Sequence, residues 1–350
     1  MLDNILSKDS SRRNFLINAG QVALSLMIAG TTSSYANQPS GTDKLGKTLP
    51  RRRLGKTGLM PTIYCTGGFH VGAQSEKVAQ GIIEAAISNG VRFFDTANQY
   101  QNGKSEEYYG KFLTPEYREF INIMSKSAAK DAATMRKHLE QSFRSMKTDH
   151  IDLYMIHTIT SPEDVDNRLD NGVLDVLREY KAKGRIGHIG FSGHNNFEAH
   201  QYLLKKNIAD IEACLMPINV ADPSYRSFII NTMESMVEKD IGILAMKSLC
   251  MGGLFGRRGG SDRQSKVVLP TVIPNKISIA QAHAFALSMP IGSLVSGVDT
   301  PQQLHDNLKS IWDYKALTKE EQDELIALCR PEALTGKMEF FKGIPKKSEG

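Results

Sequence analysis

Short apolar segments and longer segments with helical spacing alternate along most of this 350-residue chain. The apolar segments are rich in Ile, Val, Leu and Phe, which is typical of strands buried on both faces. We expect eight of them, over 62–65, 91–95, 120–124, 151–156, 186–191, 211–216, 242–246 and 292–295. Each is followed by a segment with helical spacing, over 77–89, from 105 onward, and over 132–146, 173–183, 197–205, 226–239, 279–287 and 302–311.

Eight strands with helical crossovers in about 260 residues are what a (β/α)8 barrel requires. A doubly wound open sheet is the alternative architecture, and its dinucleotide-binding turn carries the spacing GxGxxG. The first strand-to-helix turn here, residues 67–72 (GGFHVG), lacks that spacing. We therefore predict an α/β fold, a (β/α)8 TIM barrel. A glycine-containing turn within residues 52–59 predicts an N-terminal β-hairpin in front of it.

The first 36 residues have the order of an export signal. The pair Arg12 and Arg13 precedes an apolar stretch over 22–29 and a small-x-small site that ends at Ala36. The paired arginines resemble a twin-arginine signal. The apolar stretch is too short for a convincing membrane span, although an uncleaved anchor is the alternative. We expect passage through the twin-arginine export machinery, cleavage after Ala36, a periplasmic or otherwise exported protein, and no stable membrane insertion afterwards.

These features divide the chain into four parts. We expect the signal peptide over 1–36, a disordered linker over 37–47, the barrel over 48–330 and a loosely held C-terminal tail over 331–350. An insert over 252–275, rich in Gly, Arg and Ser, predicts a mobile loop over the barrel mouth, or else a surface excursion without a role. Because the twin-arginine route carries folded proteins, we also expect a cofactor to be bound before export.

Composition excludes several other classes of protein. With 41% hydrophobic residues, 23% charged residues and a net charge of +5, the chain is ordinary for a globular protein, and no nucleic-acid surface is expected. No two cysteines have metal-ligand or CxxC spacing, so we expect no metal site and no iron–sulfur cluster. Buried thiols are expected, with one disulfide open in an oxidising compartment. The cysteines are Cys65, Cys214, Cys250 and Cys329.

Ionisable residues stand at the ends of three consecutive predicted strands. They are Asp95, Lys126 and His157, and Tyr100 follows five residues after Asp95. In a (β/α)8 barrel the carboxyl ends of the strands share one face, where catalytic residues gather. Singly, each residue has an ordinary structural explanation as a cap or a core residue. As a set they predict one proton-transfer site.

The chemistry of such a site follows from acidities. A free tyrosine titrates near ~10, and the ammonium of Lys126 is expected to lower the pKa of Tyr100 by favouring the phenolate. The carboxylate of Asp95 is expected to keep Lys126 charged. Tyr100 would then give or take the proton, while a neutral His157 ring orients the substrate oxygen.

In these segments the chain resembles the aldo-keto reductase family. The resemblance covers about residues 51–308 and rests on 52–58 (RRLGKTG), 93–97 (FFDTA), Tyr100, 102–107 (NGKSEE), 152–157 (DLYMIH) and 184–192 (GRIGHIGFS). It implies that Asp95, Tyr100, Lys126 and His157 are the family's catalytic tetrad, without substitution. It also implies reversible hydride transfer between a nicotinamide cofactor and a carbonyl or alcohol such as an aldehyde, ketone or sugar.

The residues that the resemblance places around the cofactor match the family less well. They are Gly68, Phe69, Ser192, Met246, Lys247, Gly297, Asp299, Gln303 and Asn307. Gly193 replaces the family's asparagine, Leu215 stands where glutamine is common, and Met246 replaces the tyrosine that stacks on the nicotinamide. We expect Asn219 to supply a missing amide contact.

Asp299 and Gln303 replace the basic residues that would bind a 2'-phosphate. An acidic side chain suits a ribose diol and favours NAD(H), whereas the family default is NADP(H), so both cofactors stay open.

Polar residues expected at the barrel mouth suggest the substrate class. His70, Thr158 and His194, together with Asn98 and Gln99, favour a hydroxylated small molecule, ordinary loop polarity being the alternative. Two functions follow: an exported reductase of sugars or small carbonyls, or an exported cofactor-binding barrel with a redox-sensing or regulatory role and little turnover. An exported enzyme would have to regenerate its bound cofactor in place, because the periplasm offers no evident nicotinamide supply. The intact tetrad favours the enzyme.

Overall fold

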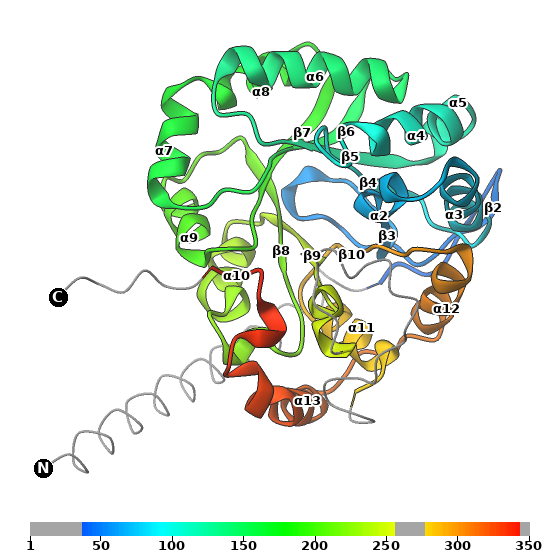
Figure 1. The fold of residues 1–350 in the computed structure, drawn as a ribbon, viewed down its shortest axis with the longest axis vertical. Helices are drawn as coiled ribbons and strands as arrows, with labels where there is room; N and C mark the ends of the chain where they lie inside the picture. The colour runs from blue at the N-terminus through cyan, green and yellow to red at the C-terminus, as the bar shows by residue number, and fades with distance from the viewer. Residues whose placement is uncertain (1–36, 256–276, 344–350) are drawn as a thin grey trace, which may run out of the picture.

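A closed barrel of eight parallel strands forms the centre of the molecule, and helices surround it (Figure 1). The computed structural model describes residues 37–255 and 277–343. The strands are β3 (Tyr64–Gly67), β4 (Phe93–Asp95), β5 (Asn122–Ser127), β6 (Ile151–Ile156), β7 (Ile186–Ser192), β8 (Ile211–Pro217), β9 (Gly242–Met246) and β10 (Ser293–Ser296). They pair in chain order, and β10 closes the ring against β3. The predicted (β/α)8 barrel is confirmed.

Helices follow the strands, and several begin at a side chain that accepts a backbone N–H. Asp131, Ser161 and Asn196 have this role for α6, α7 and α9. The helices are α2 (Gly68–Ala73), α3 (Glu76–Ser88), α4 (Lys104–Phe112), α5 (Thr114–Tyr117), α6 (Ala132–Met146), α7 (Pro162–Asp170), α8 (Val173–Ala182), α9 (Phe197–Lys205), α10 (Phe228–Glu238), α11 (Ile279–Leu287), α12 (Pro301–Trp312) and α13 (Lys319–Ala333). The prediction lacked α2, which is glycine-rich, α5, which has only four residues, and α7, which is mostly polar.

Hydrophobic side chains, most of them from the strands, fill the barrel interior, and Leu54 closes its amino-terminal end. They are Leu54, Cys65, Phe93, Met124, Leu153, Met155, Ala213, Leu215, Leu244 and Val295. Leu54 comes from the segment before β3 and is fully buried. The adjacent Gly55 packs so closely that a Cβ there would lie 2.2 Å from the backbone nitrogen of Gly242, the first residue of β9. This end is plugged, so a ligand can enter only at the opposite, carboxyl-terminal end of the strands.

The N-terminal β-hairpin is present, but it lies earlier in the chain than the turn that suggested it. Its strands are β1 (Thr42–Asp43) and β2 (Gly46–Lys47). Residues 52–59 instead turn through a short 3-10 helix, η1 (Gly55–Thr57). The disordered linker expected over 37–47 is therefore wrong. Asp43 accepts hydrogen bonds from the fully buried Arg92 at 2.7 and 2.9 Å, and this pairing holds the segment against the barrel.

The C-terminal tail is also ordered up to residue 343, contrary to the loosely held tail that was expected. The fully buried Lys342 donates to Asp222 and to Glu339, both at 2.6 Å, and to the carbonyl of Tyr225 at 2.8 Å. Asp222 and Tyr225 follow β8, far away in sequence, and Figure 1 shows the red C-terminal segment beside α10. The burial of Lys342 could not be predicted from local sequence, because two of its three partners come from a distant part of the chain.

Some expectations fall outside the described residues. The export signal over 1–36 does so, as do residues 256–275 of the predicted mouth loop and residues 344–350 of the tail. Within residues 37–255 and 277–343, no helix is both long enough and apolar enough to cross a bilayer. All four cysteines are buried, as predicted.

Replacing Lys342 tests how firmly the C-terminal segment is held. We expect Lys342→Met to destabilise the protein by about 3 kcal/mol, because the substitution leaves the carboxylates of Asp222 and Glu339 buried without their cation. Urea unfolding measures the change. Lys337→Met, an exposed lysine of the same segment, is the matched control and should change stability by less than about 0.5 kcal/mol. Equal effects of the two variants would contradict the buried ion cluster.

Candidate active site

Four ionisable side chains meet where β4, β5 and β6 end. Lys126 forms an ion pair with Asp95, and its ammonium also donates to the carbonyl of Thr96 at 2.5 Å. The same ammonium lies 4.8 Å from the centroid of the Tyr100 ring. The His157 ring stands edge-on to the Tyr100 ring, with 5.6 Å between centroids. The structure thus brings together the four residues of the predicted proton-transfer site.

The loop after β4 returns over the barrel because it continues to bond with β5. Thr96 N–H donates to the carbonyl of Met124 at 2.8 Å, and Asn98 N–H donates to that of Lys126 at 2.9 Å. These bonds carry Tyr100 back over the strand ends, where Phe69 contacts the other side of its ring, with 5.2 Å between centroids.

Gly68 permits this arrangement, since a Cβ there would lie 2.2 Å from the carbonyl oxygen of Asp95. The first turn of α2 therefore packs directly on the end of β4.

Burial decides the acidity of Tyr100. Loss of hydration raises the pKa of Tyr100 well above its ordinary value, and the negative charge of Asp95 raises it further. The lowering of this pKa that was expected from Lys126 is therefore wrong for this structure. Burial also raises the pKa of Asp95, against the opposing charge of Lys126. Tyr100 is consequently protonated at neutral pH and can donate its proton.

His157 is neutral, and its tautomer is fixed by a neighbour. Burial, followed by the positive charge of Lys126, lowers the pKa of His157 well below its ordinary value. The amide nitrogen of Gln99 lies 2.7 Å from Nδ1 of His157. Because an amide nitrogen can only donate, Nδ1 accepts and the ring proton resides on Nε2. The ring can therefore donate a hydrogen bond to a ligand oxygen, as the sequence predicts, and Gln99 is the residue that sets this tautomer.

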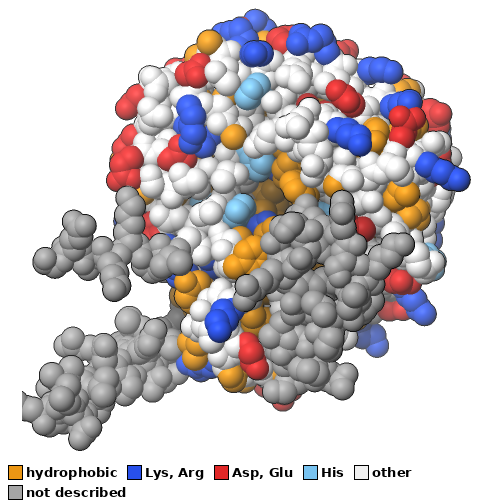
Figure 2. Space-filling model, in the orientation of Figure 1, with side chains coloured by type: hydrophobic (Ala, Val, Ile, Leu, Met, Phe, Trp, Pro, Cys, Tyr) orange, Lys and Arg blue, Asp and Glu red, His pale blue; other side chains and the backbone are white. Residues whose placement is uncertain are grey.

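Several of the residues predicted around a cofactor also lie at these strand ends. Ser192 ends β7, and its hydroxyl accepts from the backbone N–H of Thr158 at 3.3 Å. Met246 ends β9 and packs on the hydrophobic interior of the barrel. Lys247 follows it, with its ammonium 5.3 Å from the Phe341 ring centroid. Gly68 and Phe69 open α2. Figure 2 shows histidine and hydrophobic side chains around a hollow on the face seen in Figure 1.

Among the described residues, His194 carries one of several buried polar atoms that have no hydrogen-bond partner. This atom is Nδ1 of the His194 ring. Burial, and then the charge of Lys247, lowers the pKa of His194 to about 3, so its ring is neutral. A neutral imidazole nitrogen, the Ser192 hydroxyl and the Lys247 ammonium form a donor and acceptor set that fits the polar groups of a nicotinamide nucleotide.

Asn219 does not have the role that was predicted for it. Its side chain is fully buried, and its amide group donates to Glu339 at 2.8 Å. Its amide oxygen accepts the N–H groups of Ala221 and Asp222 at 2.8 and 2.9 Å. The amide is thus committed to the C-terminal segment and to its own loop. The prediction of a cofactor contact is wrong because residues more than a hundred positions away occupy the side chain.

Asp299 belongs to a polar cluster that joins β10 to α2. Its carboxylate contacts Nδ1 of His70 at 2.9 Å and accepts from the amide of Gln74 at 3.2 Å. Gln303 accepts the backbone N–H of Asp299 at 2.8 Å. His70, predicted as a substrate residue, is thus paired with Asp299.

Two further predicted cofactor residues lie beside this cluster. A Cβ at Gly297 would lie 2.2 Å from the His70 ring, so a larger residue there would displace that ring. Asn307 is buried on α12 and hydrogen-bonds the hydroxyl of Tyr64.

Gly193 stands where the family's asparagine is expected, and its surroundings show why. A Cβ at this position would lie 2.6 Å from Nε2 of His200 and 2.8 Å from the carbonyl oxygen of Ile159. His200 is fully buried on α9, between the rings of Phe191 and Phe228. The histidine behind the strand end therefore excludes any side chain at residue 193.

We expect Gly193→Asn to destabilise the protein by about 1–3 kcal/mol, because the new side chain overpacks His200 and Ile159. Urea unfolding checks this expectation. Gly184→Asn is the control, since Gly184 is exposed, has nothing within 4 Å of a built Cβ and has a left-handed backbone that asparagine tolerates. If Gly193→Asn unfolded at the same urea concentration as this control, the steric account would be wrong.

Comparisons with known proteins agree with the fold. The profile of the Aldo/keto reductase family matches residues 64–329. The chain is 29% identical over 229 residues to an uncharacterized oxidoreductase, YrpG, of Bacillus subtilis, covering 58% of this chain and 67% of that protein. It is 24% identical over 295 residues to the protein tas of Escherichia coli, covering 68% of this chain and 85% of that protein.

Among solved structures, the aldo-keto reductase AKR11C1 from Bacillus halodurans in its holo form superposes with a TM-score of 0.66 at 20% identity, covering 79% of this chain and 95% of that one. This likeness supports the barrel fold. Since the family profile covers most of the chain, the protein belongs to the aldo/keto reductase family and is an oxidoreductase that uses a nicotinamide cofactor.

Proposed function

We propose that the protein transfers a hydride between its nicotinamide cofactor and a small carbonyl or alcohol, with Tyr100 as the proton donor and acceptor. The observation that carries this proposal is the buried ammonium of Lys126, held between the Asp95 carboxylate and the Tyr100 ring. The cofactor, when bound, supplies or accepts the hydride. The chain's own residues then have to position the substrate oxygen and move one proton.

Each of the four residues has a separate task. Tyr100 is protonated at neutral pH and gives its proton to the oxygen of a carbonyl substrate. Lys126 stabilises the phenolate that results, and Asp95 balances the charge of Lys126 inside the barrel. His157 donates from Nε2 to the same substrate oxygen and so fixes its direction relative to Tyr100. For an alcohol substrate the proton moves the opposite way.

A small, hydroxylated substrate fits the mouth. His157, and His194 near it, can each form a hydrogen bond to a ligand. Thr158 follows His157 on the loop after β6. Hydroxyl groups of a sugar or of a small polyol match such groups better than an apolar chain does. We therefore assign the substrate to the sugars and small polar aldehydes or ketones.

The adenosine end of the cofactor site supports NAD(H). Asp299 and Gln303 stand where a 2'-phosphate would require basic side chains, and the Asp299 carboxylate faces His70 and Gln74. A carboxylate repels a phosphate and accepts hydrogen bonds from a ribose diol. The residues of the N-terminal signal lead us to propose in addition that the folded, cofactor-loaded protein is exported through the twin-arginine machinery.

Replacing the proposed proton donor tests the function. We expect Tyr100→Phe to slow single-turnover hydride transfer by roughly 10²–10⁴-fold, because no other protonated group is placed to replace it, while cofactor binding is retained. Stopped-flow absorbance of the reduced nicotinamide measures the rate. Tyr117→Phe, a half-buried tyrosine on α5, is the control with an unchanged rate. An unchanged rate in Tyr100→Phe would contradict the tetrad and favour a cofactor-binding protein with a sensing role.

One experiment with two preparations tests both export and the identity of the cofactor. We expect protein purified from the periplasm to contain NAD, detected by mass spectrometry after denaturation. A variant with Arg12→Lys and Arg13→Lys should stay in the cytoplasm and hold the same nucleotide. NADP in either preparation would contradict the proposed role of Asp299, and a periplasmic protein without nucleotide would contradict export of a loaded enzyme.

A further inference from the structure

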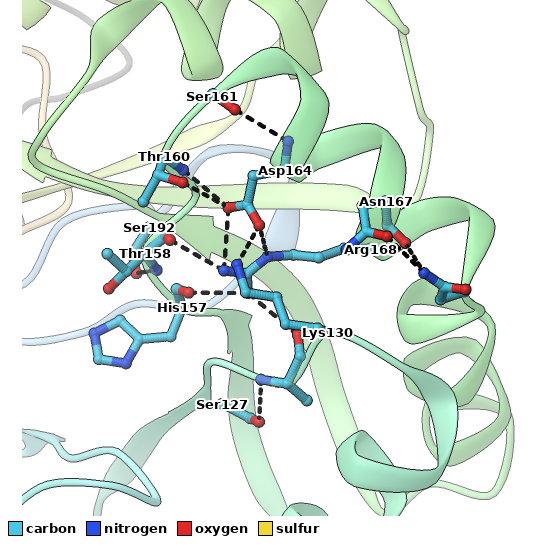
Figure 3. Close-up of polar contacts among 12 residues, drawn as sticks. Ser127, Lys130, His157, Thr158, Thr160, Ser161, Asp164, Asn167, Arg168 and Ser192 are labelled. Atoms are coloured by element: carbon cyan, nitrogen blue, oxygen red, sulfur yellow. Dashed lines mark hydrogen bonds and ion pairs between the residues drawn. The ribbon is translucent and has the colours of Figure 1, made fainter.

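Arg168 connects α7 to the loop that carries His157. Its side chain is buried, and its guanidinium donates to the carbonyl oxygens of His157 and Thr158, both at 3.1 Å, and of Ala129 at 3.3 Å (Figure 3). Ala129 follows β5, and the other two residues follow β6. One planar cation therefore joins the loops after two neighbouring strands, next to two members of the tetrad. The proposed proton transfer makes no use of this cation.

Asp164 holds the other side of the guanidinium. It accepts from Nε of Arg168 at 3.0 Å and from Nη2 at 3.2 Å, one turn away on the same helix. Burial works against ionisation of Asp164, yet the hydrogen bonds from Arg168 and then from Lys130 lower its pKa to about 2. Thr160 N–H donates to the same carboxylate at 3.0 Å. The Asp164 carboxylate is thus charged at neutral pH and fixes the orientation of the Arg168 guanidinium.

The loop held by Arg168 has an unfavourable backbone. Thr158 has a φ of 57°, which costs a β-branched residue roughly 1–3 kcal/mol unless its surroundings hold it there. Two of the three carbonyls that Arg168 binds are those of Thr158 and of the residue before it. The N–H groups of the same two residues are also bonded. His157 N–H donates to the carbonyl of Ser127 at 2.8 Å, and Thr158 N–H donates to the hydroxyl of Ser192 at 3.3 Å.

The strained turn determines where the histidine ring points. Figure 3 shows the His157 ring directed away from the guanidinium, while its carbonyl faces the guanidinium. If the turn relaxed, the peptide between His157 and Thr158 would rotate and the ring would leave the edge of Tyr100. Positions of catalytic groups have to be held within about 0.5 Å for full activity.

We propose that Arg168 is a positioning residue for the reaction, which acts through the main chain of His157 and Thr158. The proposal rests on the proposed function, since it assumes that His157 orients the substrate oxygen. Arginine is suited to the role because its planar fork reaches three carbonyls and a carboxylate together, which a lysine cannot do. The sequence analysis did not identify Arg168, because it did not predict α7, the helix on which Arg168 lies.

A double-mutant cycle separates positioning from general destabilisation. We expect Arg168→Met to reduce the single-turnover rate by about ten- to a hundredfold, with the cofactor Kd unchanged. In a His157→Gln background the same substitution should reduce the rate by less than about twofold, because the group that it positions is already absent. Arg136→Met is the matched control, since this exposed arginine of α6 pairs with Glu179 and should leave the rate unchanged in both backgrounds. If Arg168→Met does not fold, Arg168→Lys takes its place with the same expectations.

A spectroscopic measurement tests the proposal without turnover. In protein with ¹⁵N-labelled histidine, the ring signals of His157 are identified by their loss in His157→Gln. We expect Arg168→Met or Arg168→Lys to shift or broaden these signals, and Arg136→Met to leave them unchanged. Unchanged His157 signals, or an equal loss of rate with and without His157, would overturn the proposal. If the wild-type protein transferred no hydride but Arg168→Met still altered the His157 signals, the positioning would stand and the proposed function would fail.

Discussion

The ion pair between Lys126 and Asp95 is the interaction on which the mouth of the barrel depends. Both side chains are almost completely buried, and either charge alone would lose its hydration without compensation. The pair is possible because β4 and β5 run parallel in adjacent positions, so that both side chains emerge at the same edge. Parallel pairing of eight strands therefore has a chemical consequence, since it places two opposite charges in contact inside a hydrophobic barrel, next to a phenol.

Burial acts on each member of the site in a different way. It keeps Tyr100 protonated and His157 neutral, which makes both of them hydrogen-bond donors at neutral pH. The ammonium of Lys126 then matters most at the moment when the phenol loses its proton. A site of this kind does not need a tyrosine that is acidic at rest. It needs a cation that stabilises the phenolate once it forms, which agrees with the general finding that catalysis depends on binding the transition state more tightly than the ground state.

Around this centre, residues from distant parts of the chain compete for the same polar groups. The C-terminal segment accepts a hydrogen bond from the amide of Asn219, and His70 contacts one oxygen of the Asp299 carboxylate. His200 occupies the space beside Gly193, which removes the family's asparagine from the pocket. These three positions are ones that the resemblance to the family places around the cofactor, whereas Asp95, Tyr100, Lys126 and His157 lie together as the sequence predicts.

The barrel, most element positions and the meeting of Asp95, Lys126 and His157 follow from local patterns in the sequence. Apolar strands recur at regular spacing, and the ends of parallel strands must meet at one edge, so these three residues could be predicted as neighbours. The acidity of Tyr100, the partner of Asn219 and the contacts of Arg168 became known only from the folded structure. Hydration loss and hydrogen bonding depend on residues far apart in the chain, which spacing along the sequence does not encode.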